Sequence, residues 1–227
     1  LTQPHAVFLM KFNKKTVTEN TYTSIISFFF IYVLLFILSS VILSFLGIDF
    51  LTALSASASA ISCALFNEPV EEMTGIGTGI NKHQLSKKIK IIKSALELHG
   101  THFNDPASIL SCYGGKEIAA IAGSVISARL MSIPVLLDGF ISTAAASSLT
   151  LFKKRILDHC LISHLSAEPG HARILKKLKK EPILDLNLRL GEGSGAATAL
   201  LILRAALVTH NGMSTFDEAK VSKKINS

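Results

Sequence analysis

The chain has 227 residues, a formal net charge of +7 at pH 7, 49% hydrophobic residues and a mean hydropathy of +0.45. This length allows one ordinary domain with an appendage, or two small domains. Tryptophan is absent and the lysines do not alternate with aromatic residues, so the composition disfavours nucleic-acid binding. The scattered Cys63, Cys112 and Cys160 are typical of reduced thiols, and the histidines form no metal-ligand motif. We therefore expect no disulfide, no metal site and no cofactor.

Residues 25–46 form an apolar run without a charged residue. As a helix this run would be about 33 Å long, enough to cross the hydrocarbon core of a bilayer. It begins too late and runs too long for a signal peptide. The sequence therefore predicts one transmembrane helix, and Lys11, Lys14 and Lys15 favour the cytoplasm for the segment before it.

The next part of the chain is predicted to be helical. Asp49 is a candidate N-cap for a short segment over 49–55, and small residues over 55–65 predict a helix that ends at Asn67-Glu68-Pro69. An amphipathic helix is predicted over 86–98. Asp105-Pro106 begins a short helix that ends at Gly114-Gly115, and a closely packed helix rich in Ala and Gly follows over 116–130.

The C-terminal half alternates apolar runs, small residues and helical patterns. A buried strand is predicted over 134–137, ending at Asp138-Gly139, and Ser142 is expected to cap the next helix. A second short strand over 161–162 ends at Ser163-His164, a basic helix runs to Lys180, and the segment 183–190 is ambiguous. This repetition predicts an α/β fold with a Rossmann-like parallel sheet and flanking helices, preceded by the hydrophobic helix.

The stretch 188–197 is rich in glycine: Gly191, Gly193 and Gly195 alternate with Glu192 and Ser194. Peptide N–H groups at the start of a helix favour an anion. A carboxylate in such a loop repels that anion, so Glu192 is a candidate for handling a proton beside a bound phosphate. The alternative is a glycine-rich helix start in which Glu192 merely interacts favourably with the helix dipole.

Five motifs in order carry a family resemblance over about residues 57–223. They are Gly75-Ile-Gly-Thr-Gly79, Gly114-Gly115 with 117–123, 136–142, Ser163-His164 with 166–168, and 190–196. Together they resemble the nicotinate-nucleotide–dimethylbenzimidazole phosphoribosyltransferase family. The resemblance implies a cytoplasmic, homodimeric pentosyltransferase. Such an enzyme moves the ribose phosphate of nicotinate mononucleotide onto 5,6-dimethylbenzimidazole, giving α-ribazole 5′-phosphate and nicotinate.

The resemblance also implies roles for individual residues. Glu192 would be the general base. The groups that hold phosphate and nicotinate would be Gly77, Lys88, Ser166, Gly193, Ser194 and Gly195, with Lys88 as a point charge on the phosphate. Asp138 follows a strand, where acids often orient ligands. The residues alone leave alternatives open: Lys88 as a surface lysine, Ser166 as a helix cap, and Asp138 as a helix or turn cap.

The N-terminal part resembles another family. His5-Ala-Val-Phe8, 28–36 and 46–55 resemble a Trk/Ktr potassium-transporter subunit, with a basic connector, one span and the start of a pore helix. Ser57–Ser62 stand where a filter glycine is expected, and one span cannot build a selectivity filter. We therefore expect two parts, 1–55 and 56–227, joined near 53–62 as fragments of two genes. The transferase would lack its N-terminal part, which impairs it; the alternative is a non-catalytic, membrane-anchored fusion or a decayed fragment.

Overall fold

The computed structural model describes residues 11–12, 15–16, 27, 50–76, 82–189, 192–215 and 218–219. The chain divides into two compact units, Leu1–Phe50 and Leu51–Ser227. In the first unit, β1 (Lys11–Phe12) pairs with β2 (Lys15–Thr16) in antiparallel fashion. The predicted spanning segment 25–46 lies, apart from Ser27, outside the described residues. No helix in the described part of the chain has the length and apolar character needed to cross a bilayer.

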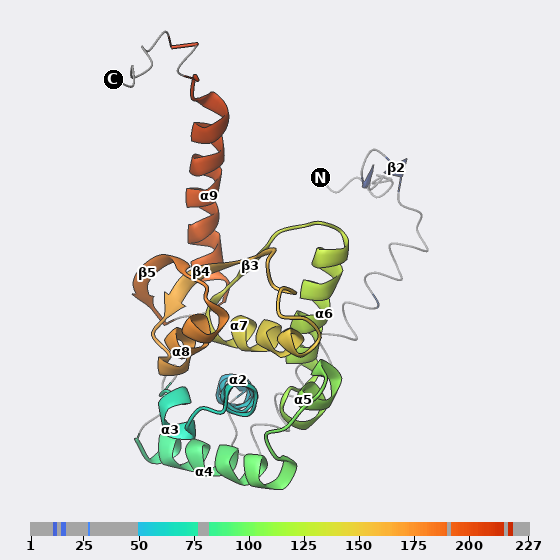
Figure 1. Ribbon diagram of the computed structural model, residues 1–227, viewed down its shortest axis with the longest axis vertical. Coiled ribbons are helices and arrows are strands. Elements are labelled where there is room, and N and C mark those ends of the chain that lie inside the picture. The colour runs from blue at the N-terminus through green and yellow to red at the C-terminus, as the bar shows by residue number, and fades with distance from the viewer. Residues whose placement is uncertain are drawn as a thin grey trace, which may run out of the picture. The chain divides into compact units, whose positions relative to one another are not determined.

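The second unit begins with a run of helices (Figure 1). These are α2 (Phe50–Phe66), α3 (Val70–Met73), α4 (Lys82–His99), α5 (Pro106–Tyr113) and α6 (Lys116–Leu130). Fully or almost fully buried side chains from α2 to α5 form one apolar core, among them Ile61, Met73, Ile92 and Ile109. This core fixes the face of α4 that points inward, as the amphipathic pattern predicts.

Local signals set the ends of these helices. Asp105 caps α5 as predicted, because its Oδ1 accepts the Ser108 N–H at 2.9 Å. Helix α2 is continuous over Phe50–Phe66, so the predicted short segment is part of this helix from Phe50 onward, and the candidate cap Asp49 lies outside the described residues. Helix α6 has the predicted bounds. Its expected close packing is wrong at Gly123, where an added β-carbon would meet nothing within 4 Å.

Three parallel strands follow: β3 (Val135–Leu137), β4 (Cys160–Ser166) and β5 (Pro182–Leu188), in the order β3-β4-β5. The α/β class, the parallel sheet and its flanking helices are therefore confirmed. Strand β4 is longer than predicted because it is the central strand and pairs along both sides. Strand β3 is an edge strand, and only Leu137 of its residues is buried. The ambiguous segment before the glycine-rich loop is β5.

Helices connect and cover the strands (Figure 1). They are α7 (Gly139–Ser147), which continues into the 3₁₀ turn η1 (Ser148–Leu151), α8 (Pro169–Leu178) and α9 (Ser194–Gly212). Ser142 lies inside α7 and does not cap it. The reason is that Gly139, at φ +72°, turns the chain from strand to helix at once. A second apolar core, including Leu137, Leu149, Ile162 and Leu175, joins these helices to the sheet.

Candidate active site

The carboxyl ends of β3 and β4 and the start of α9 meet at one edge of the sheet. Asp138 directly follows β3, and β4 ends with His164, Leu165 and Ser166. The pairing of β4 with β5 is irregular between His164 and Ser166, which re-aims the side chains there. In parallel sheets ligands bind outside this edge. The structure therefore brings the predicted residues of β3, β4 and α9 together.

The carboxylate of Asp138 caps α9. Its Oδ1 accepts the Ala196 N–H at 2.8 Å and its Oδ2 accepts the Gly193 N–H at 3.1 Å. It makes no side-chain cap for α7, the helix that follows it in the chain. Asp138 is thus a helix cap, but of a helix that begins far along the chain. The Gly193 amide, which the resemblance assigns to phosphate, donates to a carboxylate of the protein itself.

His164 lies between two glycines and is 3% exposed. A β-carbon on Gly195 would collide with its imidazole, and one on Gly139 would lie 3.1 Å from its Cε1. The ring Nδ1 lies 3.0 Å from Ser163 Oγ and 3.7 Å from Asp138 Oδ1. Gly195 is therefore needed for close packing of α9 on this ring. Sequence reasoning missed His164 as a site residue, although its place at a strand end was a usable signal.

Glu192 stands directly before the cap of α9. Its backbone is left-handed, at φ 57°, as is that of Gly193 at φ 75°. For a residue with a side chain this conformation costs roughly 1–2 kcal/mol, and such strain concentrates at functional sites. The Glu192 side chain is exposed. It nevertheless stays at the Asp138 corner, because the next amide, that of Gly193, is bonded to Asp138. Ser194, half-buried, is the first residue of α9.

Lys88 belongs to a second polar cluster. It comes from α4, is 3% exposed, and its Nζ donates to Ser55 Oγ of α2 and to the Gly75 carbonyl oxygen, the latter at 3.3 Å. Burial lowers the pKa of Lys88, and the nearby charge of Glu168 opposes this. The alternative of a surface lysine is therefore wrong, since a lysine almost never enters the interior without polar partners. Gly77, which the resemblance assigns to the same binding set, lies outside the described residues.

Ser166 is held by a buried histidine. Its N–H donates to His171 Nδ1 at 2.9 Å, and His171 Nε2 lies 3.1 Å from Thr143 Oγ1, which in turn donates to the Gly139 carbonyl at 2.6 Å. Burial, and to a lesser extent the proximity of His164, lowers the pKa of His171 to about 4. The ring is thus neutral, with its proton on Nε2. This chain of bonds ties the end of β4 to the end of β3.

The hydroxyl of Ser166 faces the start of α8 without capping it. Its Oγ accepts the Glu168 N–H at 3.3 Å, and Glu168 itself occupies the N-cap position. The hydroxyl proton is therefore available to a ligand. Through Glu168, which packs against Gly75, the Ser166 end of the sheet connects to the Lys88 cluster. In the described residues, no group of three or more His, Cys, Asp or Glu side chains is placed to hold a metal ion.

Several known proteins are similar in sequence to the α/β unit of this chain. Residues 51–221 match the family model described as phosphoribosyltransferase. Proteins named nicotinate-nucleotide–dimethylbenzimidazole phosphoribosyltransferase from Brucella canis and Brucella anthropi are 47% identical over 165 residues, which is 73% of this chain and 49% of theirs. The chain thus spans about half the length of the curated relatives it matches.

Solved structures agree with this similarity. A structure of a protein called CobT from Thermus thermophilus has a TM-score of 0.70 and 38% identity, over 75% of this chain and 50% of that one. A second structure from the same organism, of a nicotinate-nucleotide–dimethylbenzimidazole phosphoribosyltransferase, has a TM-score of 0.67 and 36% identity, over 75% of this chain and 49% of that one. The similarity therefore extends over most of the α/β unit.

Proposed function

Because the chain belongs to the phosphoribosyltransferase family, we propose that it transfers the ribose phosphate of nicotinate mononucleotide to 5,6-dimethylbenzimidazole. The products are α-ribazole 5′-phosphate and nicotinate. The observation that carries the proposal is the position of Glu192, next to an amide that Asp138 holds at the carboxyl edge of the sheet. The 47% identity to relatives named for this reaction supports the same substrates.

The chemistry suits an exposed carboxylate at this corner. In the substrate the bond from the ribose to the pyridinium nitrogen breaks, and its electron pair stays on the nitrogen of neutral nicotinate. A benzimidazole nitrogen forms the new bond to the ribose with its lone pair. The other benzimidazole nitrogen then loses a proton, which the Glu192 carboxylate accepts. A positioned general base of this kind contributes about 10²–10⁴-fold to a rate.

The remaining residues bind and position. Lys88 places its positive charge beside the phosphate, and the Ser166 hydroxyl donates a hydrogen bond to the nucleotide. Asp138 orients the Glu192 loop and does not contact the phosphate, since its carboxylate is occupied by α9. Gly195 allows α9 to approach His164. Gly77 and Ser194 complete the proposed set, Ser194 at the start of α9.

The test is a transfer assay on the full chain with both substrates. We expect measurable turnover that Glu192→Gln lowers by about 10²–10⁴-fold while leaving the thermal midpoint unchanged. Glu181→Gln, which changes an exposed carboxylate before β5, is the matched control and should keep full activity. Absence of turnover in the unaltered chain, or equal turnover in Glu192→Gln, would overturn the proposal in favour of a protein that binds ligand without catalysis.

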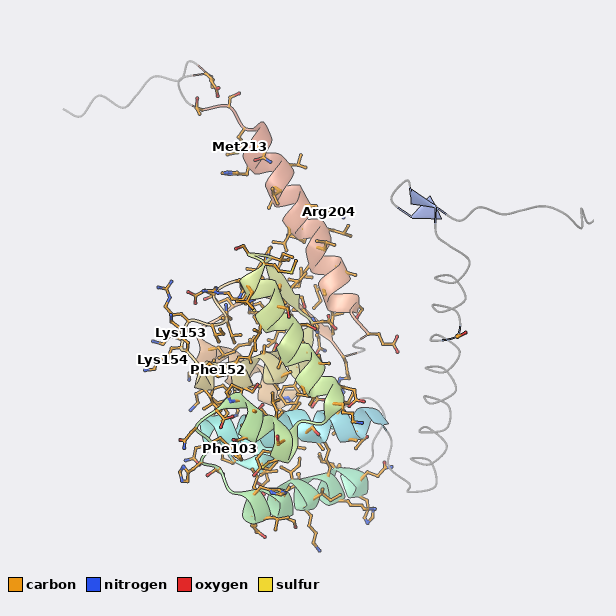
Figure 2. The ribbon with its side chains drawn as sticks, turned by 90° about the vertical axis from the view of Figure 1, so that its right-hand side faces the viewer. Phe103, Phe152, Lys153, Lys154, Arg204 and Met213 are labelled. Carbon is orange, nitrogen blue, oxygen red and sulfur yellow. The ribbon has the colours of Figure 1, made fainter. Side chains whose placement is uncertain are left out.

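We propose further that two copies of the chain associate through α9. The outer part of this helix extends away from the sheet, and Arg204 and Met213 mark it in Figure 2. Several of its apolar side chains are exposed, including Leu201 at 65% and Val208 at 74%. Water-exposed apolar rows of this kind favour association. Light scattering should give a dimer mass that Val208→Glu reduces to that of a monomer; a monomeric unaltered chain would contradict this.

For residues 1–55 we propose a transporter-like segment whose apolar run 25–46 lies in a membrane. The uncharged run and its basic flank support this. The α/β unit is proposed to be cytoplasmic, where nucleotide substrates are found. Since the basic flank also places the residues before the run in the cytoplasm, the run is proposed to enter the membrane without carrying the following unit across it. Carbonate extraction of membranes tests the segment: retention of the full chain supports it, and release into the supernatant contradicts it.

A further inference from the structure

Glu168 carries a buried acceptor to which no described residue donates. Its Oε2 has no hydrogen-bond partner among the described residues, a state it shares there with Thr74 Oγ1. Glu168 occupies the N-cap position of α8, yet its side chain makes no cap bond. A buried acceptor without a donor costs free energy, most of all when it is charged. The carboxylate therefore lies against Gly75 and does not cap the helix that it precedes, and no described residue donates to its Oε2.

The carboxylate and the Lys88 ammonium lie on either side of Gly75. A β-carbon on Gly75 would collide with Glu168 Oε2, so the oxygen lies against the α-carbon of this glycine. The carbonyl of the same residue accepts from Lys88 Nζ at 3.3 Å. A lysine ammonium has three donors, and Ser55 and Gly75 take two of them. Among the described residues, one donor of Lys88 and one acceptor of Glu168 thus remain for a ligand in the same small region.

These two groups select a particular kind of ligand. The spare Lys88 donor suits a phosphate oxygen. The Glu168 carboxylate repels phosphate and requires a hydrogen-bond donor. A ribose phosphate offers both, because its ring hydroxyls are only a few bonds from its phosphate. Acidic side chains bind ribose hydroxyls in this way at the strand ends of other α/β proteins.

We propose that Glu168 accepts a hydrogen bond from a ring hydroxyl of the ribose whose phosphate is held by Lys88. The inference rests on the proposed function and extends it by naming the residue that distinguishes ribose from deoxyribose. The alternative role for Glu168 is to keep Lys88 charged. The two roles differ in one measurable respect, because only the first depends on a ligand hydroxyl.

The experiment measures binding by calorimetry, without the benzimidazole, so that no transfer is needed. The ligands are methyl riboside 5-phosphate, its 2-deoxy and 3-deoxy counterparts, and inorganic phosphate. We expect the full chain to bind the riboside about 10- to 100-fold more tightly than the counterpart that lacks the contacted hydroxyl, as for other hydrogen bonds to charged groups. In Glu168→Ala this ratio should fall to near one, while inorganic phosphate should bind at least as tightly as to the unaltered chain, because the carboxylate that repels it is gone.

Controls separate the outcomes. Glu97→Ala removes an exposed carboxylate on the same helix as Lys88 and should keep the full ratio. If Glu168→Ala unfolds at a lower temperature than the unaltered chain, Glu168→Gln, which preserves the side-chain shape, replaces it in the binding measurement. An unchanged ratio in both Glu168 variants, an equal loss for riboside and phosphate, or no riboside binding by the unaltered chain overturns the inference. Failure of the transfer assay with an intact ratio would reject only the proposed function.

Discussion

Among single residues, Asp138 is the side chain on which the geometry of the site depends most. Its two oxygens accept two amide N–H groups of α9, and a negative charge at a helix start is favoured by the helix dipole. Asp105 does the same at α5, where it accepts the N–H and the hydroxyl of Ser108. The two residues therefore form a matched pair, one inside the candidate site and one outside it.

We predict that Asp138→Ala and Asp105→Ala each lower the free energy of unfolding by about 1–2 kcal/mol, the usual cost of losing a cap. Only Asp138→Ala should also lower transfer, because it frees the loop that carries Glu192. Urea denaturation and the transfer assay measure the two effects. Equal activity of the two variants would contradict the positioning role of Asp138.

The left-handed backbone of Glu192 lowers the stability of the fold, and we propose that it places the side chain for catalysis. We predict that Glu192→Gly raises the free energy of unfolding by about 1 kcal/mol, since glycine adopts φ 57° without strain, and that it abolishes transfer. Lys179→Gly is the control, because Lys179 is also left-handed, at φ 53°, where α8 ends. It should gain similar stability in urea denaturation and retain activity. A Glu192→Gly variant no more stable than the unaltered chain would show that no strain is stored there.

Between elements, the contact of α9 with β4 depends on the absence of a side chain. Gly195 of α9 lies against the His164 ring of β4, so the helix can approach the sheet at the point where Asp138 caps it. The positions of α9 and β4 therefore depend on each other. A change at this contact should move the Glu192 loop even though Glu192 itself is untouched.

We predict that Gly195→Ala lowers the free energy of unfolding by about 1–3 kcal/mol, as for other overpacked contacts, and speeds amide exchange along the first turn of α9. Gly123→Ala provides the comparison, because a β-carbon there meets nothing within 4 Å. It should stabilise α6 by about 0.5–1 kcal/mol. Gly195→Ala with unaltered stability and exchange would refute the close contact.

For the molecule as a whole, His171 couples stability to pH. Its pKa is about 4 in the folded chain and about 6.5 in an unfolded one. The unfolded state therefore binds more protons between these values, and stability falls as the pH falls from 6.5 to 4. The loss from this one residue approaches roughly 3 kcal/mol. The effect reaches the whole fold, because His171 links the end of β4 to α7.

We predict that urea midpoints of the unaltered chain drop between pH 7 and pH 4.5 more than those of His171→Gln. That variant should be less stable at pH 7, since it breaks the bonds to Ser166 and Thr143. His83→Gln, at an exposed position of α4, should follow the unaltered chain at both pH values. Parallel pH profiles for His171→Gln and the unaltered chain would contradict the prediction.

Features that depend on residues close together in the chain can be predicted from the sequence alone. Asp105-Pro106 predicts the start of α5, the Ala-rich run predicts α6, and the alternation of strands and helices predicts a parallel sheet. Each signal acts through backbone preferences or a cap within one turn of a helix. The glycine-rich loop also indicated Glu192, because a carboxylate among helix-starting glycines is unusual in any context.

How distant residues share the site became visible only in the folded chain. In the folded chain Lys88 is buried against α2, and the Asp138 carboxylate accepts from an amide 58 positions further along the chain. Glu168 Oε2 has no donor among the described residues. No local pattern carries this information, because these contacts depend on which surfaces pack together. The spacing of residue types along the chain specifies the helix or strand to which a residue belongs. Its charge state, its hydrogen-bond partners and its exposure to solvent are set by the elements that pack around it.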